Sequence, residues 1–226
     1  MRNNNALKIF AHTNRYVYIA AISIILFNSN MMTDTRTDIL TAHFKSIREV
    51  GFQGLRTDKV IADLNITKGA FYHYFKTKYD IGYAIVDEII SPRYIGTWKH
   101  LEESQTHPID GIIDSLELLK QYTHNDNIKL GCPLNNLMQE MSPLDEGFRL
   151  RLQNIVEVIR SLIETALRSG QLVGLVRQDV SARAVSYFIL ASVEGSYGIA
   201  KNLQSYSVFE QSIDTLADYV RTLRTE

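Results

Sequence analysis

Two short helical patterns that lie close together in residues 51–80 leave this chain few choices of fold. Apolar side chains recur at helical spacing over residues 57–64, and a second short helical pattern runs over about 67–74. Only a tight turn at residues 64–66 separates the two patterns. Two short helices joined in this way predict a helix-turn-helix unit.

The residue types around this turn fit the prediction. Asn65 stands where the turn needs a left-handed backbone, which asparagine tolerates better than most other non-glycine residues. Thr57 is the expected N-cap of the first short helix, and Ala62 is small enough for two helices to cross. We expect Leu64 and Ile66, which flank the turn, to be buried.

Helical patterns also cover the rest of the chain. With only 4 prolines and 12 glycines in 226 residues, few residues break helices, and no strand pattern competes. The sequence therefore predicts an all-α fold. The further helices are expected at about 35–50, 78–96, 108–122, 142–170 and 181–203, and from 207 onward.

Capping residues predict where the helices of the C-terminal half begin and end. They are Ser142 with Pro143 at the start of a long helix and Gly170 at its end, Ser181 or Asp179 at the start of the next helix, and Ser207 with Glu210 as a capping box for the last helix.

The charge is spread unevenly, although the net charge is only −1. Residues 1–32 carry a net charge of +3, residues 33–80 carry +2, and residues 81–226 carry −6. Because the field of a charged patch is local, the mildly basic N-terminal part can contact phosphates in a nearly neutral protein.

Residues 1–32 are expected to be an extension that is not part of the fold. The apolar run at residues 16–27 resembles a weak signal-peptide core, and a membrane-spanning helix needs about twenty residues. Met31 and Met32 directly precede the first expected helix, which favours an upstream start-site assignment. A functional tail or a membrane anchor remains the alternative.

The second short helix carries groups that can contact nucleic acid. Its exposed face is expected to hold Thr67, Lys68, Tyr72 and His73, which offer a hydroxyl, a cation and two polar aromatic tips. Gly69 lets the backbone approach a phosphate closely. The alternative is that the aromatic residues 71–75 form only a small core, which we expect for Phe71 and Phe75.

At these residues the sequence resembles the TetR/AcrR family of bacterial regulators, over about residues 33–90. The resemblance rests on Gly51-Phe52, on Thr57, on Ile61-Ala62 and on the run from Lys68 to Lys78. It departs from the family pattern at Asn65, where glycine is usual, and at Tyr74, where histidine is frequent. By position, the resemblance implies phosphate contacts for Thr57, Tyr72 and Lys78, and major-groove positions for Thr67, Lys68, Gly69 and His73.

The resemblance also implies the domain organisation and the partners. It implies a helix-turn-helix DNA-binding domain at 33–80 and a ligand-binding and dimerisation domain at 81–226. The protein is then expected to be a cytoplasmic, nucleoid-associated homodimer that binds a palindromic operator in double-stranded DNA. A small-molecule effector would release it from the operator, and repression is the family default, with activation left open.

Aromatic and methionine side chains of the C-terminal part are candidates for an effector pocket. The alternative is that most of them are core residues. The candidates are Trp98, Tyr122, Met138, Phe148 and Tyr187.

Cys132 is the only cysteine, which excludes an intramolecular disulfide and fits a reducing cytoplasm. The segment around Gly131-Cys132 resembles a NemR-like, electrophile-responsive branch of the family, which implies a sensing thiol. A reactive thiolate needs a helix N-terminus or a cation, and Pro133 and Lys129 are in place for these roles. An inert buried cysteine is the alternative.

The last two helices are expected to form the dimer interface as a four-helix bundle. A stripe of mostly small residues would let helices approach, and larger residues of the last helix would add bulk. These are Ala184, Phe188, Ala191, Ser192, Gly195 and Gly198, with Leu216, Tyr219, Val220 and Leu223.

Other classes of protein find little support in the sequence. The six histidines show no metal-ligand spacing, and no phosphate loop or nucleophile motif is evident, so neither an enzyme nor a cofactor is expected. A membrane-anchored helical protein is a weaker alternative that rests only on residues 16–27.

Overall fold

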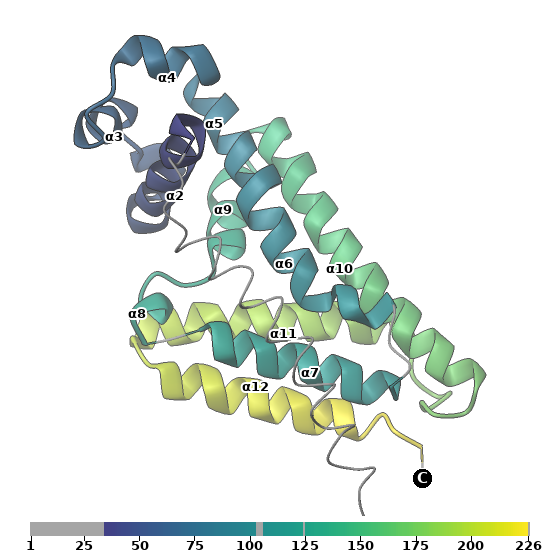
Figure 1. The fold of residues 1–226 in the computed structure, drawn as a ribbon. Coiled ribbons are helices and arrows are strands. Elements are labelled where there is room, and N and C mark those ends of the chain that lie inside the picture. The colour runs from purple at the N-terminus through teal and green to yellow at the C-terminus, as the bar shows by residue number, and fades with distance from the viewer. Residues whose placement is uncertain (1–33, 103–105, 124, 226) are drawn as a thin grey trace, which may run out of the picture. The chain divides into compact units, whose positions relative to one another are not determined.

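Helices make up nearly all the regular structure in the computed structural model, which describes residues 34–102, 106–123 and 125–225 (Figure 1). Within these ranges no strand forms, and an isolated β-bridge joins Val176 to Arg224. The predicted all-α fold class is confirmed. The predictions about residues 1–32, including the apolar run, lie outside the described residues.

Three helices form the part that we call the head: α2 (Thr35–Gly54), α3 (Thr57–Asp63) and α4 (Lys68–Tyr74). α2 is kinked at Gly51, whose φ of 78° is a conformation that L side chains rarely adopt. Asn65 has a φ of 54°, the left-handed conformation expected of it between α3 and α4. The helix-turn-helix prediction is confirmed, with Leu64 and Ile66 half-buried at the turn.

An interrupted helix leads from the head into the remaining helices, which we call the body. It consists of α5 (Lys78–Ile85), a π-helical turn η1 (Val86–Ile90) and α6 (Ser91–Trp98), followed by the 3₁₀ turn η2 (Lys99–Glu102). Ser91 N–H donates to the Val86 carbonyl in the wide π turn, and Pro92, which has no N–H to donate, follows directly. The predicted uniform helix at 78–96 was wrong in this detail.

The rest of the body consists of α7 (Pro108–Tyr122), α8 (Asn125–Ile128), α9 (Pro133–Met141), α10 (Glu146–Leu172), α11 (Ala182–Leu203) and α12 (Tyr206–Arg221). Figure 1 shows α7, α11 and α12 lying side by side, while α6 and α10 run together toward the head. α10 buries residues at spacings of three and four, such as Leu152, Ile155, Ile159 and Ile163. Each such buried side chain contributes about 1.5–3 kcal/mol to stability.

In the C-terminal half, three predicted helix ends differ from the structure. α10 begins after Asp145, not at Ser142-Pro143, because Asp145 Oδ1 accepts hydrogen bonds from both Phe148 N–H and Tyr83 OH at 2.8 Å. α10 continues two residues past Gly170. α12 is capped by Ser205 instead of Ser207, whereas the predicted cap of α11 by Ser181 is confirmed.

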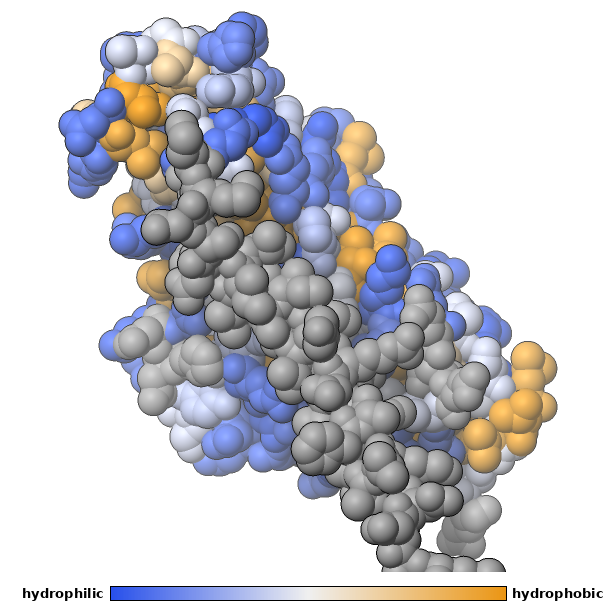
Figure 2. Space-filling view, in the orientation of Figure 1, coloured by the Kyte–Doolittle hydropathy of each residue, from blue (hydrophilic) through white to orange (hydrophobic). Residues whose placement is uncertain are grey.

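The surface of the described residues is mostly hydrophilic in the view of Figure 2, with several apolar groups, one of them where α10 ends. Leu172, Val173 and Leu175 form this group, and all three are exposed. Between residues 34 and 225, as far as they are described, no helix combines the length and apolar character that a membrane crossing requires.

Candidate nucleic-acid interface and sensor region

α4 is built so that one face anchors it and the other is free. Thr67 caps the helix, since its hydroxyl accepts a hydrogen bond from Ala70 N–H at 3.1 Å. Phe71 and Phe75, four residues apart, are buried, and their ring centroids lie 5.9 Å from each other. Tyr72 and His73 therefore point away from the core, and both are exposed.

The structure brings five of the seven predicted DNA-binding residues together on the exposed side of α4. They are Thr67, Lys68, Gly69, Tyr72 and His73. The Lys68 ammonium pairs with Asp58 of α3 at 3.1 Å, with both side chains about two-thirds exposed. Such an exposed pair contributes little stability, so Lys68 can exchange Asp58 for another anion at small cost.

The other two predicted residues lie differently. Thr57 is not the cap of α3, because Arg56 occupies the N-cap position, and the Thr57 hydroxyl is buried without a hydrogen-bond partner in the described residues. Lys78 is half-buried at the start of α5, where it donates to the Gln53 carbonyl at 3.1 Å and lies over the Phe52 ring. Desolvation by burial lowers the pKa of Lys78.

A buried histidine lies in the core of the head. His43 Nδ1–H donates to the Ile39 carbonyl at 2.8 Å, and its ring stacks on Phe71 at 5.3 Å. Its Nε2 is buried and has no partner among the described residues. Burial lowers the pKa of His43, although the bond to Ile39 acts in the opposite direction.

A carboxylate of the body holds the backbone of the head. Glu140 of α9 accepts hydrogen bonds from Phe52 N–H at 2.9 Å and from Gln53 N–H at 2.7 Å. The close approach needs a glycine at position 51, because a Cβ there would lie 2.9 Å from Glu140 Oε1. Carboxylate-to-amide bonds of this length are among the stronger hydrogen bonds in proteins, so the position of α9 affects the head directly.

A cavity of about 510 Å³ lies beside this contact, between α2 and α9. Its walls include the polar side chains of Arg48, Asn136, Glu140 and Lys201. Lys201 Nζ donates to Asn136 Oδ1 at 3.1 Å. The volume lies in the range of small-molecule sites.

The structure does not bring the predicted sensor residues into one pocket. Trp98 and Phe148 are buried core residues, and Phe148 packs on Phe52 with ring centroids 4.6 Å apart. Met138 is half-buried. Tyr122 and Tyr187 are exposed, on α7 and α11, and Tyr187 OH donates to Glu157.

Cys132 lies in a setting opposite to that of a reactive thiolate. It is the N-cap of α9, as predicted from Pro133, and its Sγ lies 3.4 Å from Asn135 N and 3.2 Å from Tyr94 OH. Complete burial, reinforced by the neighbouring Glu194, raises the pKa of the Cys132 thiol. The expected activation by the helix N-terminus and Lys129 is therefore outweighed by burial.

Glu194 of α11 is a half-buried acid with a buried carboxylate oxygen, and it was not among the predicted functional residues. Burial raises its pKa to about 7, and its Oε2 has no partner among the described residues. Arg48, Arg93 and Glu140 were missed as well, because their importance depends on contacts between helices that are far apart in sequence. The only sequence signal for such a residue is a charged side chain within an apolar helical pattern, and of these residues Glu194 on α11 shows it.

The predicted dimer residues fall into two groups. Ala184, Phe188, Ala191, Gly195 and Gly198 form an exposed face of α11, with Ser192 partly exposed. In contrast, Leu216, Val220 and Leu223 are buried within the chain itself, so their expected place at a dimer surface was wrong. Tyr219 packs edge-on against Phe188 at 5.0 Å.

Both parts of the chain match known protein families. Residues 39–84 match the bacterial regulatory proteins of the tetR family, and residues 108–216 match the tetracyclin repressor-like C-terminal domain. An uncharacterised HTH-type transcriptional regulator from Lactococcus lactis is 28% identical over 197 residues, which cover 82% of this chain and 92% of that protein. The HTH-type transcriptional repressor DhaR of Mycobacterium is 23% identical over 164 residues, or 73% and 81% of the two chains.

The fold agrees with these matches. The crystal structure of Escherichia coli NemR in its reduced form superposes with a TM-score of 0.70 and 21% identity, over 85% of this chain and 98% of that one. Since both the helix-turn-helix part and the C-terminal part match, the chain belongs to the TetR family of transcriptional regulators, which are DNA-binding proteins and not enzymes.

Proposed function

We propose that this regulator is a cytoplasmic repressor that binds a palindromic operator as a homodimer and leaves it when a small molecule binds the body. The exposed face of α4 carries the proposal, because its core-facing Phe71 and Phe75 hold Lys68, Tyr72 and His73 outward. We place the domain boundary near residue 80, with the DNA contacts in residues 33–80 and effector binding in residues 81–226.

The residues of the head suit both kinds of DNA contact. Lys68 and the Tyr72 hydroxyl can bond phosphates or base edges, and the exposed Gly69 backbone allows close approach. Lys78 is already fixed at the start of α5 by Gln53, which suits a phosphate contact that sets the orientation of the head. Thr57 would have to reach a phosphate with its hydroxyl turned outward, so we give it the smallest role.

The exposed face of α11 supports a homodimer. Gly195 and Gly198 lie in the middle of this helix, where each glycine costs about 1 kcal/mol relative to alanine. A Cβ at either position would meet nothing within 4 Å in the described structure, so the fold of one chain gives no reason for glycine there. Close packing of a second copy on this face supplies the reason, and a twofold partner would present two α4 helices to successive major grooves.

Contacts between head and body support effector control. Glu140 of α9 holds the head backbone, and Phe148 of α10 packs on Phe52. An effector that shifts α9 or α10 therefore changes the position of α4. It can favour release only to the extent that it binds the released conformation more tightly.

DNA selection followed by retardation tests the proposal. DNA sequences selected from a random pool by the purified protein should converge on an approximate palindrome. Binding to it should weaken steeply as salt rises, because phosphate contacts release counterions. The Lys68→Ala/Tyr72→Ala double variant should lose retardation, whereas Lys99→Ala, which removes an exposed lysine of the body, should keep it. Undiminished binding by the double variant would refute the α4 assignment.

A thiol-sensing repressor is the second candidate, and one observation favours it. Cys132 caps the helix whose other end holds the head through Glu140, so an adduct on the buried sulfur would have to displace α9. The raised pKa of Cys132 slows this chemistry until the site opens. N-ethylmaleimide should then release wild-type protein from its operator and leave Cys132→Ser bound; equal release of both would reject this mechanism.

A further inference from the structure

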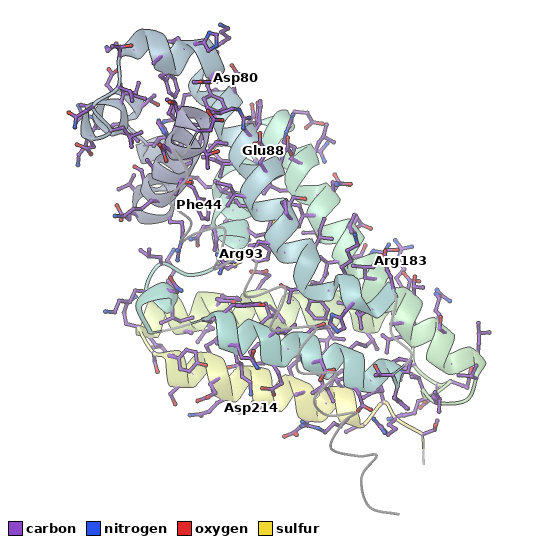
Figure 3. The ribbon with its side chains drawn as sticks, in the orientation of Figure 1. Phe44, Asp80, Glu88, Arg93, Arg183 and Asp214 are labelled. Carbon is purple, nitrogen blue, oxygen red and sulfur yellow. The ribbon has the colours of Figure 1, made fainter. Side chains whose placement is uncertain are left out.

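A small polar cavity lies where head and body meet, and two arginines line it. Arg48 comes from α2 and Arg93 from α6, and Figure 3 shows Arg93 between the head helices and the layer of α7 and α11. Tyr94, Thr123, Asn127 and Tyr197 provide further polar groups in the walls. The cavity measures about 20 Å³, which is room for a small polar group but not for a whole organic ligand.

Neither arginine forms an ion pair with a carboxylate within the described residues, and Glu49 acts on Arg48 only through a weaker electrostatic attraction. Arg48 Nη2 donates to Asn127 Oδ1 at 3.3 Å, while its Nε is buried without a partner. Arg93 makes no ion pair or hydrogen bond through its side chain with the described part of the chain. Burial, and next the positive charge of Arg93, lower the pKa of Arg48, so the two cations repel each other.

Arginines without a carboxylate partner are unusual in the C-terminal part of this chain. Of the eight arginines after residue 140, seven pair with a carboxylate, and Arg183 has no such partner among the described residues. Two arginines that share a polar cavity without an acid between them leave a place for an anion. An anion there would relieve the repulsion between the two guanidinium groups and accept charge-assisted hydrogen bonds from them.

The shape of the site indicates which anion. A carboxylate is planar and accepts two parallel hydrogen bonds from a guanidinium, and it suits so small a cavity better than a tetrahedral phosphate. The neighbouring 510 Å³ cavity shares Arg48 and Pro133 with this one, which gives an organic tail a place to extend. The start of α9 at Pro133 adds the positive end of a helix dipole.

We propose that the carboxylate of a small organic anion binds between Arg48 and Arg93 and ties the first head helix to the body. Such a ligand contacts α2, which carries the head, and also the helix that begins at Pro133 and ends near Glu140. As the effector of a repressor, a role that rests on the function proposed above, it would act on the junction itself and not on the core of the body.

Binding can be measured with Trp98, the only tryptophan, which is buried on the same helix as Arg93. The probes are acetate, propionate, butyrate and benzoate, each compared with its neutral amide at constant ionic strength, with inorganic phosphate as a further anion. At least one carboxylate should change the fluorescence saturably and raise the melting temperature, and its amide should do neither.

Variants assign the response to the cavity. Arg93→Gln, an exposed position, should weaken carboxylate binding at least tenfold, whereas Arg183→Gln, at the arginine of α11 that lacks a carboxylate partner, should leave it unchanged. The proposal is overturned if no carboxylate binds, if amides or phosphate bind as well, or if Arg93→Gln binds normally. Operator retardation tests the proposed repressor separately. If the wild-type protein binds the carboxylate but no selected DNA, the carboxylate site stands and the proposed repressor is refuted.

Discussion

The charge on Asp58 limits how well α4 can bind an anionic partner. Its carboxylate pairs with Lys68 on the face that we assign to DNA, and both side chains are largely exposed. Phosphates must compete with this carboxylate and also suffer its repulsion. The local balance of charge on this face, more than the net charge of the chain, therefore sets the affinity for DNA.

We predict that Asp58→Asn binds operator DNA about fivefold more tightly than the wild type, which corresponds to about 1 kcal/mol. The substitution frees Lys68 and removes one negative charge near the phosphates. Retardation at fixed salt measures the effect, with Asp218→Asn, which breaks an exposed pair with Arg221, as the matched control. Equal affinity of Asp58→Asn and wild type would show that Lys68 does not face the phosphates.

His43 gives the head a pH dependence whose sign is fixed by its burial. Its pKa is lowered from 6.5, so the folded protein resists a proton that the unfolded chain accepts. The stability that the neutral ring provides is present above pH 6.5 and is lost as the pH falls below it. Between pH 7.5 and 5.5 the melting temperature of the wild type should therefore fall relative to that of His43→Leu. Glu194, whose raised pKa acts in the opposite direction, affects both proteins equally and cancels in this comparison. His73→Leu, at an exposed ring, should follow the wild type; identical slopes for all three would contradict this account.

At the scale of the helices, α9 is the element that sequence predicted least well. Its N-cap was predictable, since a proline at the first position of a helix is a local signal. The boundary between α9 and the next helix, α10, was not predictable. Ser142-Pro143 are good residues for starting a helix, but α10 begins after Asp145, because Asp145 accepts hydrogen bonds from both Phe148 N–H and the distant Tyr83 OH. Local signals predicted the turn and the core of the head, because both lie within about forty residues, but they misplaced the N-cap of α3 by one residue.

The contacts that position the candidate site could not be predicted in this way. Glu140 meets Phe52 across 88 residues of sequence, and Arg48 meets Asn127 across 79. Nothing in the residues around either partner signals the pairing. The exposed stripe of α4 follows from helical period alone, whereas the junction of head and body depends on how the helices pack.

We predict that Glu140→Ala destabilises the protein by about 1–3 kcal/mol, because two backbone N–H groups of the head lose a charged acceptor. Operator affinity should fall as well, since the head is held less firmly. Urea unfolding and retardation measure the two effects. Gln139→Ala, at the exposed neighbouring position of α9, should change neither. A stable Glu140→Ala variant with normal DNA affinity would mean that α9 does not position the head.

On the scale of the whole molecule, the proposed repressor needs two chains, and Gly195 offers the sharpest test. In one chain a Cβ at this exposed position meets nothing within 4 Å of the described residues, so we expect Gly195→Leu to fold and melt normally on its own. Against a second α11 the leucine would prevent close approach. We therefore expect Gly195→Leu to elute as a monomer by size-exclusion chromatography with light scattering, and to bind a full palindrome no better than a half-site. Gly96→Leu adds the same side chain at an equally open, exposed glycine of α6 and should remain dimeric. A dimeric Gly195→Leu would move the interface away from this face of α11, and a monomeric wild type would leave the spacing of the two α4 helices without a cause.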